Sequence, residues 1–259
     1  HCHSARNIDE ERRALEALWA PEGDGLACLS VRSAFDLFLS ALALPPGSEV
    51  LLSAVSIPDM ARLVREHGLV PGPVDIDRAT LAPCVESAER ARSAKSRVLV
   101  LAHLLGGRFD PAPLIAWARG HDIRVVEDCA QGFLSPAERG APNADVTMYS
   151  FGTIKTTTAV GGALVRISDS QLLARMRALE AAWPVQSTAR YAKRLARAGA
   201  LLAVQEPHVY RGIERLTALA RRDFHATIIG AIRGFPVPAG QTLGAQLRYR
   251  PSPALLATL

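Results

Sequence analysis

The sequence predicts an α/β protein with a mostly parallel, doubly wound sheet, followed by a helical and partly irregular C-terminal extension. Between about residues 26 and 167, short apolar runs alternate with helical patterns, which is typical of consecutive βαβ units. Several of these runs are apolar at every position, as expected for strands that are covered on both faces. The chain has 259 residues, 49% of them hydrophobic, which is enough for one large core.

Strands and helices are expected to follow one another along this region. Pro58, Pro83 and Pro111 stand where the first turn of a helix tolerates proline. We expect strands over residues 50–52, 69–74, 98–102, 123–126, 146–149 and 163–167, and helices over 32–43, 58–67, 83–93 and 111–120. Ligands of a parallel sheet bind beyond the carboxyl ends of its strands, so functional residues should come directly after the apolar runs.

The chain is expected to divide into a helical segment over residues 1–25, a large domain over 26–182 and an extension over 183–259. Residues 171–182, at the end of the large domain, and residues 186–225, in the extension, have helical periodicity. Residues 230–253 are rich in Gly and Pro and are expected to be irregular. The last residues begin another helical pattern at Pro253. We therefore expect the extension to be the start of an incomplete C-terminal domain.

The composition argues against several classes of protein. No apolar run approaches the ~18 residues of a membrane-spanning helix, and the first residues lack the apolar stretch of a secretory signal. The four cysteines have no metal-ligand spacing, so we expect no metal and a reduced, cytoplasmic protein. The net charge is +5. The basic face of Arg190, Arg194 and Arg197 can touch nucleic acid or anionic lipid, but without interleaved aromatics a solvated helix face is favoured.

Lysine is rare in this chain: of 30 basic residues only three are lysine. Lys95 and Lys193 lie among charged and polar residues, as is typical of solvated helix faces. Lys155 lies in the neutral, Gly/Thr-rich stretch 151–162. Unlike arginine, a lysine can lose its proton and attack a carbonyl carbon, so Lys155 is a candidate nucleophile. A general bias toward arginine is the alternative explanation.

Two of the expected strands end in residues suited to one kind of site. Asp128 and Gln131 follow the strand 123–126, and a carboxylate there can hold a protonated pyridine nitrogen. Its alternative role is a helix cap. Ser150 ends the next strand and precedes Lys155, which would place a hydroxyl for a phosphate near an amine for an aldehyde. The alternative is a surface lysine after a strand.

A third strand end lies near the beginning of the large domain. Residues 29–35 pass from a strand into a helix, and the free N–H groups of a first helical turn form a natural phosphate seat. Arg32 and Ser33 would add a charge and a hydroxyl to it. The alternative is that Ser30 simply caps the helix.

Taken together, these motifs resemble the DegT/DnrJ/EryC1/StrS family of pyridoxal-phosphate-dependent aminotransferases, which have the aspartate-aminotransferase fold (fold type I). The resemblance covers about residues 26 to 168 in both order and spacing. Its motifs are Gly47-Ser-Glu-Val-Leu-Leu, Val74-Asp-Ile-Asp77, Leu101-Ala-His103-Leu-Leu-Gly106, Val126-Glu-Asp-Cys-Ala-Gln131, Ser150-Phe-Gly-Thr-Ile-Lys155 and Gly161-Gly.

The resemblance implies a role for each of the candidate residues. Lys155 would hold pyridoxal 5′-phosphate (PLP) as a Schiff base, the internal aldimine, and move the proton between substrate and cofactor. Asp128 would hold the pyridine nitrogen, and Gln131 would lie near the ring oxygen. Ser150, with the backbone of residues 32–33, would receive the phosphate. Family relatives that act as dehydratases carry histidine in place of the lysine, so Lys155 favours amino transfer.

The chain departs from the family pattern in three places. The usual ring-stacking aromatic is replaced by aliphatic candidates, Val55 and Ile57, so that Ile57 and His103 are the expected neighbours of the ring or substrate. Val31-Arg32 replaces a Gly-Thr pair and adds a cation beside the phosphate. After Gly162, the loop that reaches the partner subunit's site is not recognisable.

The resemblance also implies a reaction and partners. We expect an aminotransferase that moves an amino group from an amino donor to a small-molecule carbonyl substrate, with a keto-sugar nucleotide as a candidate. A homodimer is expected, and no nucleic-acid partner. The alternatives are another PLP enzyme of this fold, such as a lyase or decarboxylase, and a non-catalytic relative that uses its basic tail for binding. Retention of Lys155, Asp128 and Gln131 together argues against the last.

Overall fold

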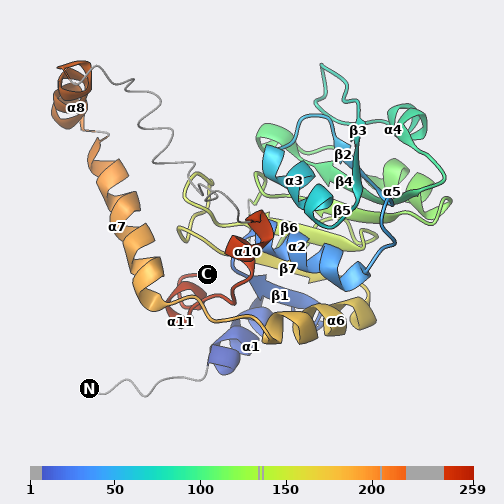
Figure 1. The fold of residues 1–259 in the computed structure, drawn as a ribbon, viewed down its shortest axis with the longest axis horizontal. Helices are drawn as coiled ribbons and strands as arrows, with labels where there is room; N and C mark the ends of the chain where they lie inside the picture. The colour runs from blue at the N-terminus through green and yellow to red at the C-terminus, as the bar shows by residue number, and fades with distance from the viewer. Residues whose placement is uncertain (1–7, 134, 136, 205, 220–241) are drawn as a thin grey trace.

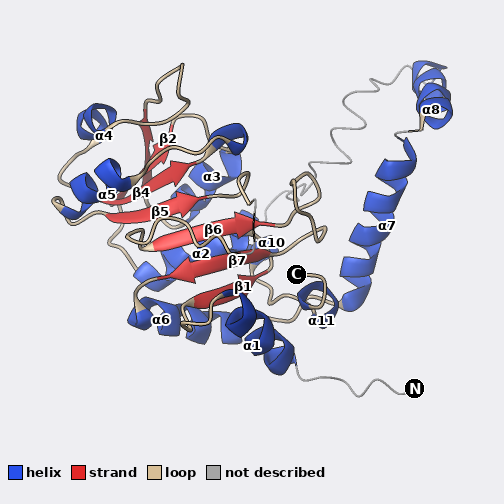
Figure 2. Cartoon of the chain, turned by 180° about the vertical axis from the view of Figure 1, so that it is seen from behind, coloured by secondary structure: helices blue, strands red, loops and turns tan. Residues whose placement is uncertain are grey.

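A computed structural model describes residues 8–133, 135, 137–204, 206–219 and 242–259. Within them a seven-stranded sheet has the order β1-β7-β6-β5-β4-β2-β3 (Figures 1 and 2). The strands are β1 (Gly25–Cys28), β2 (Glu49–Ser53), β3 (Val70–Val74), β4 (Ser96–Ala102), β5 (Arg124–Asp128), β6 (Val146–Ser150) and β7 (Ala163–Ile167). The strands from β3 to β6 pair in parallel, whereas β7 runs antiparallel to both β6 and β1. The predicted α/β fold with a mostly parallel sheet is confirmed.

Helices cover both faces of the sheet (Figures 1 and 2). They are α1 (Ile8–Trp19), α2 (Val31–Leu42), α3 (Pro58–Glu66), α4 (Val85–Ala91), α5 (Ala112–Arg119) and α6 (Ser170–Ala181), with a short 3-10 turn at Leu104–Gly106. The extension adds α7 (Thr188–Val204), α8 (Pro207–Leu219), α10 (Leu243–Leu247) and α11 (Pro253–Leu256). No helix of the described residues is both long and apolar enough to cross a membrane.

Alternation along the central strands builds the core on both faces. Val126 of β5 packs in the cluster that contains Phe35 of α2, whereas Val125 packs with Leu114 and Ile115 of α5. Successive side chains of a strand point to opposite faces, which explains why the central runs are apolar throughout. Each fully buried side chain of this size contributes roughly 1.5–3 kcal/mol to folding.

Helix α2 begins where the sequence places a phosphate seat. Ser30 is its N-cap and accepts a hydrogen bond at Oγ from the N–H of Ser33, 3.1 Å away. The helix ends at Ala43, which adopts the left-handed conformation with φ 48°. Ser30 therefore caps the helix, as the alternative interpretation of this segment expected. The start of α2 directly follows the carboxyl end of β1.

The end of the extension is packed into the large domain. Leu243 and Leu247 of α10 belong to the same core cluster as Phe35 and Leu63. The carboxylate of Glu66 accepts hydrogen bonds from the first two N–H groups of α10, those of Leu243 at 2.8 Å and Gly244 at 2.9 Å. The sequence predicted an irregular chain as far as residue 253. The part of it over 230–241 lies outside the described residues, but α10 is a short, anchored helix.

Helices α7 and α8 are arranged differently from the rest. In both views they extend away from the sheet, with the N-terminal end of α7 close to α11 (Figures 1 and 2). Tyr191 anchors that end: it is 1% exposed, and its hydroxyl donates to the carbonyl of Ala159 at 2.8 Å. It packs with Leu29 and Leu255 in a small separate cluster. This contact brings the start of α7 next to the loop that carries Lys155.

Candidate active site

Lys155 lies in a loop that leaves the carboxyl end of β6 and returns as β7. The loop is closed at its base, where the N–H of Phe151 donates to the carbonyl of Gly162 at 3.1 Å and the N–H of Gly161 to that of Phe151 at 2.9 Å. Gly162 has φ +87°, and a Cβ there would lie 2.7 Å from the side chain of Leu259. Only glycine fits this conformation and this space. The closed base holds the half-buried Lys155 at the sheet edge.

The surroundings of Lys155 favour its neutral amine. Burial lowers the pKa of Lys155, and the charge of Arg32 lowers it further, while Asp128 acts in the opposite direction. The net shift is downward. A lysine with a lowered pKa has more of the unprotonated form that attacks a carbonyl carbon. The structure therefore places Lys155 in a suitable environment for an imine-forming residue.

Asp128 is the last residue of β5, is half-buried, and lies close enough to Lys155 to interact electrostatically. Its Oδ1 accepts the N–H of Ala130 at 2.9 Å. Burial raises the pKa of Asp128, and this rise outweighs the opposing effects of the Ala130 N–H, Lys155 and His103. A carboxylate in such a place is stabilised by a cation brought to it, which is the property that a partner of a pyridinium nitrogen needs.

Gln131 and Ser150 lie between Asp128 and Lys155 in the chain. The Oε1 of Gln131 accepts the N–H of Leu105 at 3.0 Å, which ties it to the turn after β4. Ser150 ends β6 and is half-buried, with its Oγ 3.4 Å from the N–H of Gly152. Both therefore lie at the carboxyl edge of neighbouring strands, where the sequence predicted the site.

The proposed phosphate seat is only partly as expected. Arg32 forms an ion pair with Asp59 of α3, which the sequence analysis did not single out. The hydroxyl of the buried Ser33 donates to the carbonyl of Leu247, and its N–H donates to Ser30. Both groups of Ser33 are thus engaged within the protein, because α10 covers this side of α2. Arg32 remains near Lys155, and Ser33 now has a structural role.

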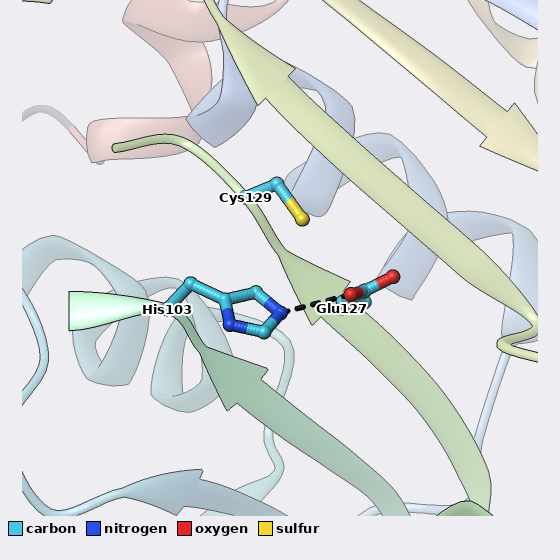
Figure 3. Close-up of side chains that lie close together, drawn as sticks. All are labelled: His103, Glu127 and Cys129. Atoms are coloured by element: carbon cyan, nitrogen blue, oxygen red, sulfur yellow. Dashed lines mark hydrogen bonds and ion pairs between the residues drawn. The ribbon is translucent and has the colours of Figure 1, made fainter. Parts of the chain in front are cut away.

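The two expected neighbours of the ring both follow the carboxyl ends of strands, but Ile57 is exposed and His103 is buried. Ile57 is 50% exposed, and it precedes α3 directly after β2. The imidazole of His103 is 2% exposed, and its Nε2 lies 2.8 Å from Oε1 of Glu127 (Figure 3). Glu127 and Asp128 are successive strand residues and point to opposite faces. The side chain of His103 is therefore directed to the other face of the sheet from that of Asp128, and its place beside the ring stays a prediction.

His103, Glu127 and Cys129 form a buried group whose possible ligand atoms lie within 4.8 Å of one another (Figure 3). The Glu127 carboxylate and the Cys129 sulfur already have partners within the protein, whereas Nδ1 of His103 is buried without a hydrogen-bond partner among the described residues. The second oxygen of Glu127 accepts the N–H of Ala141 at 2.7 Å, and a guanidinium nitrogen of Arg108 lies 3.4 Å from the Cys129 sulfur. Burial raises the pKa of Cys129 above its ordinary range. A neutral thiol beside a guanidinium group is a poor metal ligand. His103 and Glu127 form a buried, hydrogen-bonded pair in the wall of a 370 Å³ cavity.

The residues at the carboxyl edge fit PLP as a group. They supply an amine with a lowered pKa, a half-buried carboxylate near it, and a cation at the start of a helix, all at or just after the ends of strands. These correspond to the aldehyde, the pyridine nitrogen and the phosphate of the cofactor.

Comparison with known proteins gives the family. The model of the DegT/DnrJ/EryC1/StrS aminotransferase family matches residues 11–223. The chain belongs to this family. The family uses PLP, so the cofactor that the sequence predicts and the enzyme class are confirmed at the level of the family. The runner-up activities, lyase and decarboxylase, are not favoured by any of the named relatives below.

Two curated relatives are sugar-nucleotide enzymes by name. A UDP-N-acetyl-3-dehydro-alpha-D-glucosamine 3-aminotransferase from Acidithiobacillus ferrooxidans is 31% identical over 178 residues, which cover 66% of this chain and 48% of the relative. A GDP-perosamine synthase from Caulobacter vibrioides is 28% identical over 156 residues, which cover 60% of this chain and 42% of the synthase. The chain thus spans about half the length of the curated relatives it matches.

Solved structures agree in fold. An aminotransferase from Psychrobacter cryohalolentis matches with TM-score 0.58 and 28% identity, over 66% of this chain and 45% of the other. NtdA from Bacillus subtilis, solved with bound cofactor PMP, matches with TM-score 0.60 and 23% identity over 68% and 40%. The fold type I architecture expected from the sequence is confirmed by these likenesses.

Proposed function

We propose that this chain forms the cofactor-binding part of a PLP-dependent aminotransferase whose substrate is a keto-sugar nucleotide. The observation that carries the proposal is the pairing of Lys155 and Asp128 at the carboxyl edge of β5 and β6, where each affects the pKa of the other. The names of the two curated relatives support the substrate class. When bound, PLP would supply an electron sink for the substrate carbon.

Each residue of the site has a stated task in this proposal. Lys155, held by the closed loop, attaches the cofactor through its Nζ and then moves a proton at the substrate carbon. Asp128 keeps the pyridine nitrogen protonated. Arg32 and Ser150 bind the phosphate, and the amide of Gln131 lies near the ring oxygen. The exposed Ile57 offers aliphatic contact to the ring in place of an aromatic.

Borohydride labelling tests the attachment site. The purified protein incubated with PLP should absorb as an imine, and borohydride followed by peptide mapping should leave a pyridoxyl group on Lys155. A label on Lys95 or Lys193 would sink the assignment. Glutamate or glutamine should convert the cofactor to its amine form only for an aminotransferase, so absence of this half-reaction would favour a lyase or decarboxylase.

We also propose a homodimer in the cytoplasm. Three exposed apolar side chains follow strands at the carboxyl edge, those of Val55, Leu105 and Ile154, which are 54%, 82% and 67% exposed. Apolar side chains gathered near a site are typical of an interface with another subunit. The free cysteines Cys28, Cys84 and Cys129 support a reducing compartment.

A further inference from the structure

Arg194 of α7 lies against the loop that carries Lys155. A Cβ placed on Gly161 would be only 3.3 Å from Nη1 of Arg194 and 3.5 Å from its Cζ, so the guanidinium group rests on the backbone of this glycine. Tyr191, one turn earlier on α7, fixes the position because its buried hydroxyl donates to Ala159 of the same loop. Sequence reasoning had placed Arg194 on a solvated face.

Gly161 joins the two parts of the proposed phosphate seat. On one side, its N–H donates to Phe151, which directly follows Ser150. On the other side, the N–H of Gly162 donates to the carbonyl of Leu29 at 3.0 Å, and Leu29 precedes the start of α2. A side chain that rests on Gly161 therefore lies between the end of β6 and the first turn of α2.

The electrostatics of this place favour an anion. Burial lowers the pKa of Arg194, and the charges of Arg32, Arg190 and Arg197 lower it further, against an opposing effect of Tyr191. Because arginine keeps its proton in proteins, the part of the shift that comes from these three arginines reports a positive potential around the guanidinium group. The ion pair between Arg32 and Asp59 is part of these surroundings and does not reverse the sign of the shift.

We propose that Arg194 is a phosphate-binding residue that acts together with Arg32. Their guanidinium groups, one from α7 and one from α2, would lie on two sides of the seat and receive a phosphate-type anion. Arginine suits this task because its planar group forms paired hydrogen bonds with phosphate oxygens. The inference rests on the proposed function. Two sources share this chemistry: the phosphate of the cofactor and the diphosphate of a nucleotide-linked substrate.

Ligand titrations with the variant Arg194→Ala test the proposal without any turnover assay. Lys193→Ala is the matched control, because the exposed Lys193 loses the same charge from the same turn of α7. Inorganic pyrophosphate is titrated into the cofactor-free protein by calorimetry. PLP and pyridoxal, which lacks the phosphate, are titrated by absorbance. UDP is then titrated into the PLP-loaded protein. Melting temperatures measured without ligand show whether each variant is folded. If Arg194→Ala is unfolded, Arg194→Gln takes its place in the titrations.

Arg194→Ala should weaken pyrophosphate binding by about tenfold or more, the lower end of what a hydrogen bond to a charged group contributes, while Lys193→Ala should leave it unchanged. Weaker PLP binding with unchanged pyridoxal binding assigns the cofactor phosphate as the ligand. Unchanged PLP binding with weaker UDP binding assigns the substrate diphosphate. Unchanged affinity for pyrophosphate, PLP and UDP overturns the proposal. If the wild type binds no PLP but binds pyrophosphate through Arg194, the proposed function fails and the anion site stands.

Discussion

At the scale of single residues, Asp128 and Lys155 affect each other in opposite senses. Burial raises the pKa of Asp128 and lowers that of Lys155, so both are shifted toward their neutral forms, and each partly opposes the shift of the other. A neutral amine is what imine formation needs, whereas the ionised carboxylate is what the pyridinium needs. The cofactor's ring nitrogen would therefore complete the site by supplying a cation to Asp128.

Replacing Asp128 should separate cofactor binding from catalysis. In Asp128→Ala, Lys155 and the phosphate contacts remain, so PLP should still be bound and reducible by borohydride. Turnover should fall by about 10²-fold or more, because an electrostatic stabiliser of the developing negative charge is lost. Stopped-flow absorbance of the half-reaction with glutamate measures this directly. Normal half-reaction rates in the variant would show that Asp128 is not the partner of the ring nitrogen.

The ion pair between Arg32 and Asp59 leads to a paired prediction. Arg32→Ala should weaken PLP binding by roughly ten- to a hundred-fold, because a hydrogen bond to a charged group contributes about 1.5–3 kcal/mol. Asp59→Asn should strengthen PLP binding, because it removes the carboxylate that competes with phosphate for the same guanidinium group. Titration of PLP by absorbance checks both. If both variants bind PLP as the wild type does, Arg32 is not a phosphate contact.

At the scale of elements, the position of α10 depends on a buried charge. Asp36 of α2 is 1% exposed, and its carboxylate receives hydrogen bonds from Arg248 at 2.9 and 3.2 Å. His67 Nε2 lies 2.9 Å from the same carboxylate. Burial raises the pKa of Asp36, but the hydrogen bonds of His67 and Arg248 outweigh it, and the net shift is downward. The carboxylate thus fastens the chain end after α10 to α2 and α3.

This arrangement predicts acid sensitivity. A carboxyl group whose pKa is lower when folded stabilises the fold above its unfolded pKa of about 3.9, and this contribution is lost as the pH falls through the folded pKa. The free energy of unfolding of the wild type should therefore fall as the pH is lowered below about 4. In Asp36→Asn the stability at pH 7 should already be reduced, and the acid-dependent loss should be smaller. Urea unfolding at pH 7 and pH 3.5 measures the difference. An equal acid-dependent loss in both proteins would contradict it.

The strands show how far sequence reasoning reaches. Residues 163–167 were expected as a strand and form β7 with those bounds, because a short, mostly apolar run between turn residues allows few alternatives. Strand β7 runs antiparallel to β6 because the closed loop that carries Lys155 connects them directly. The amino acids of the strand do not indicate this direction. The helix that begins at Pro83 in the sequence pattern begins at Val85 in the structure, with Cys84 as its N-cap. Helix ends vary by such amounts because a single cap decides them.

The sequence predicted those residues of the candidate site that stand next to the end of a strand. It did not predict contacts between segments that lie far apart in the chain. Asp128 and Ser150 end neighbouring strands and Lys155 follows one of them, so the topology alone brings them to one edge. His103 also follows a strand, but strand alternation and the buried Glu127 turn it to the other face. The contact of Arg194 with Gly161 joins a loop to the extension, and no local pattern in the chain reports it.

At the scale of the whole molecule, apolar residues at the carboxyl edge bear on assembly. Leu105 is 82% exposed in the turn after β4, close to the site through the hydrogen bond of its N–H to Gln131. Leu18 of α1 is equally exposed, but it precedes β1 and so lies toward the opposite end of that strand. An exposed leucine near a catalytic cleft is costly in a monomer and useful at an interface. The two leucines therefore form a matched pair for testing the proposed homodimer.

Light scattering should find a homodimer for the wild type at micromolar concentration. Leu105→Glu should shift it toward monomer, because a charge in an apolar interface must be desolvated without a partner. Leu18→Glu adds the same charge elsewhere and should leave the dimer intact. PLP binding by the Leu105→Glu monomer should weaken if the partner subunit helps to close the site, and should be unchanged if each chain closes its own. A wild type that is strictly monomeric and active would contradict the dimer.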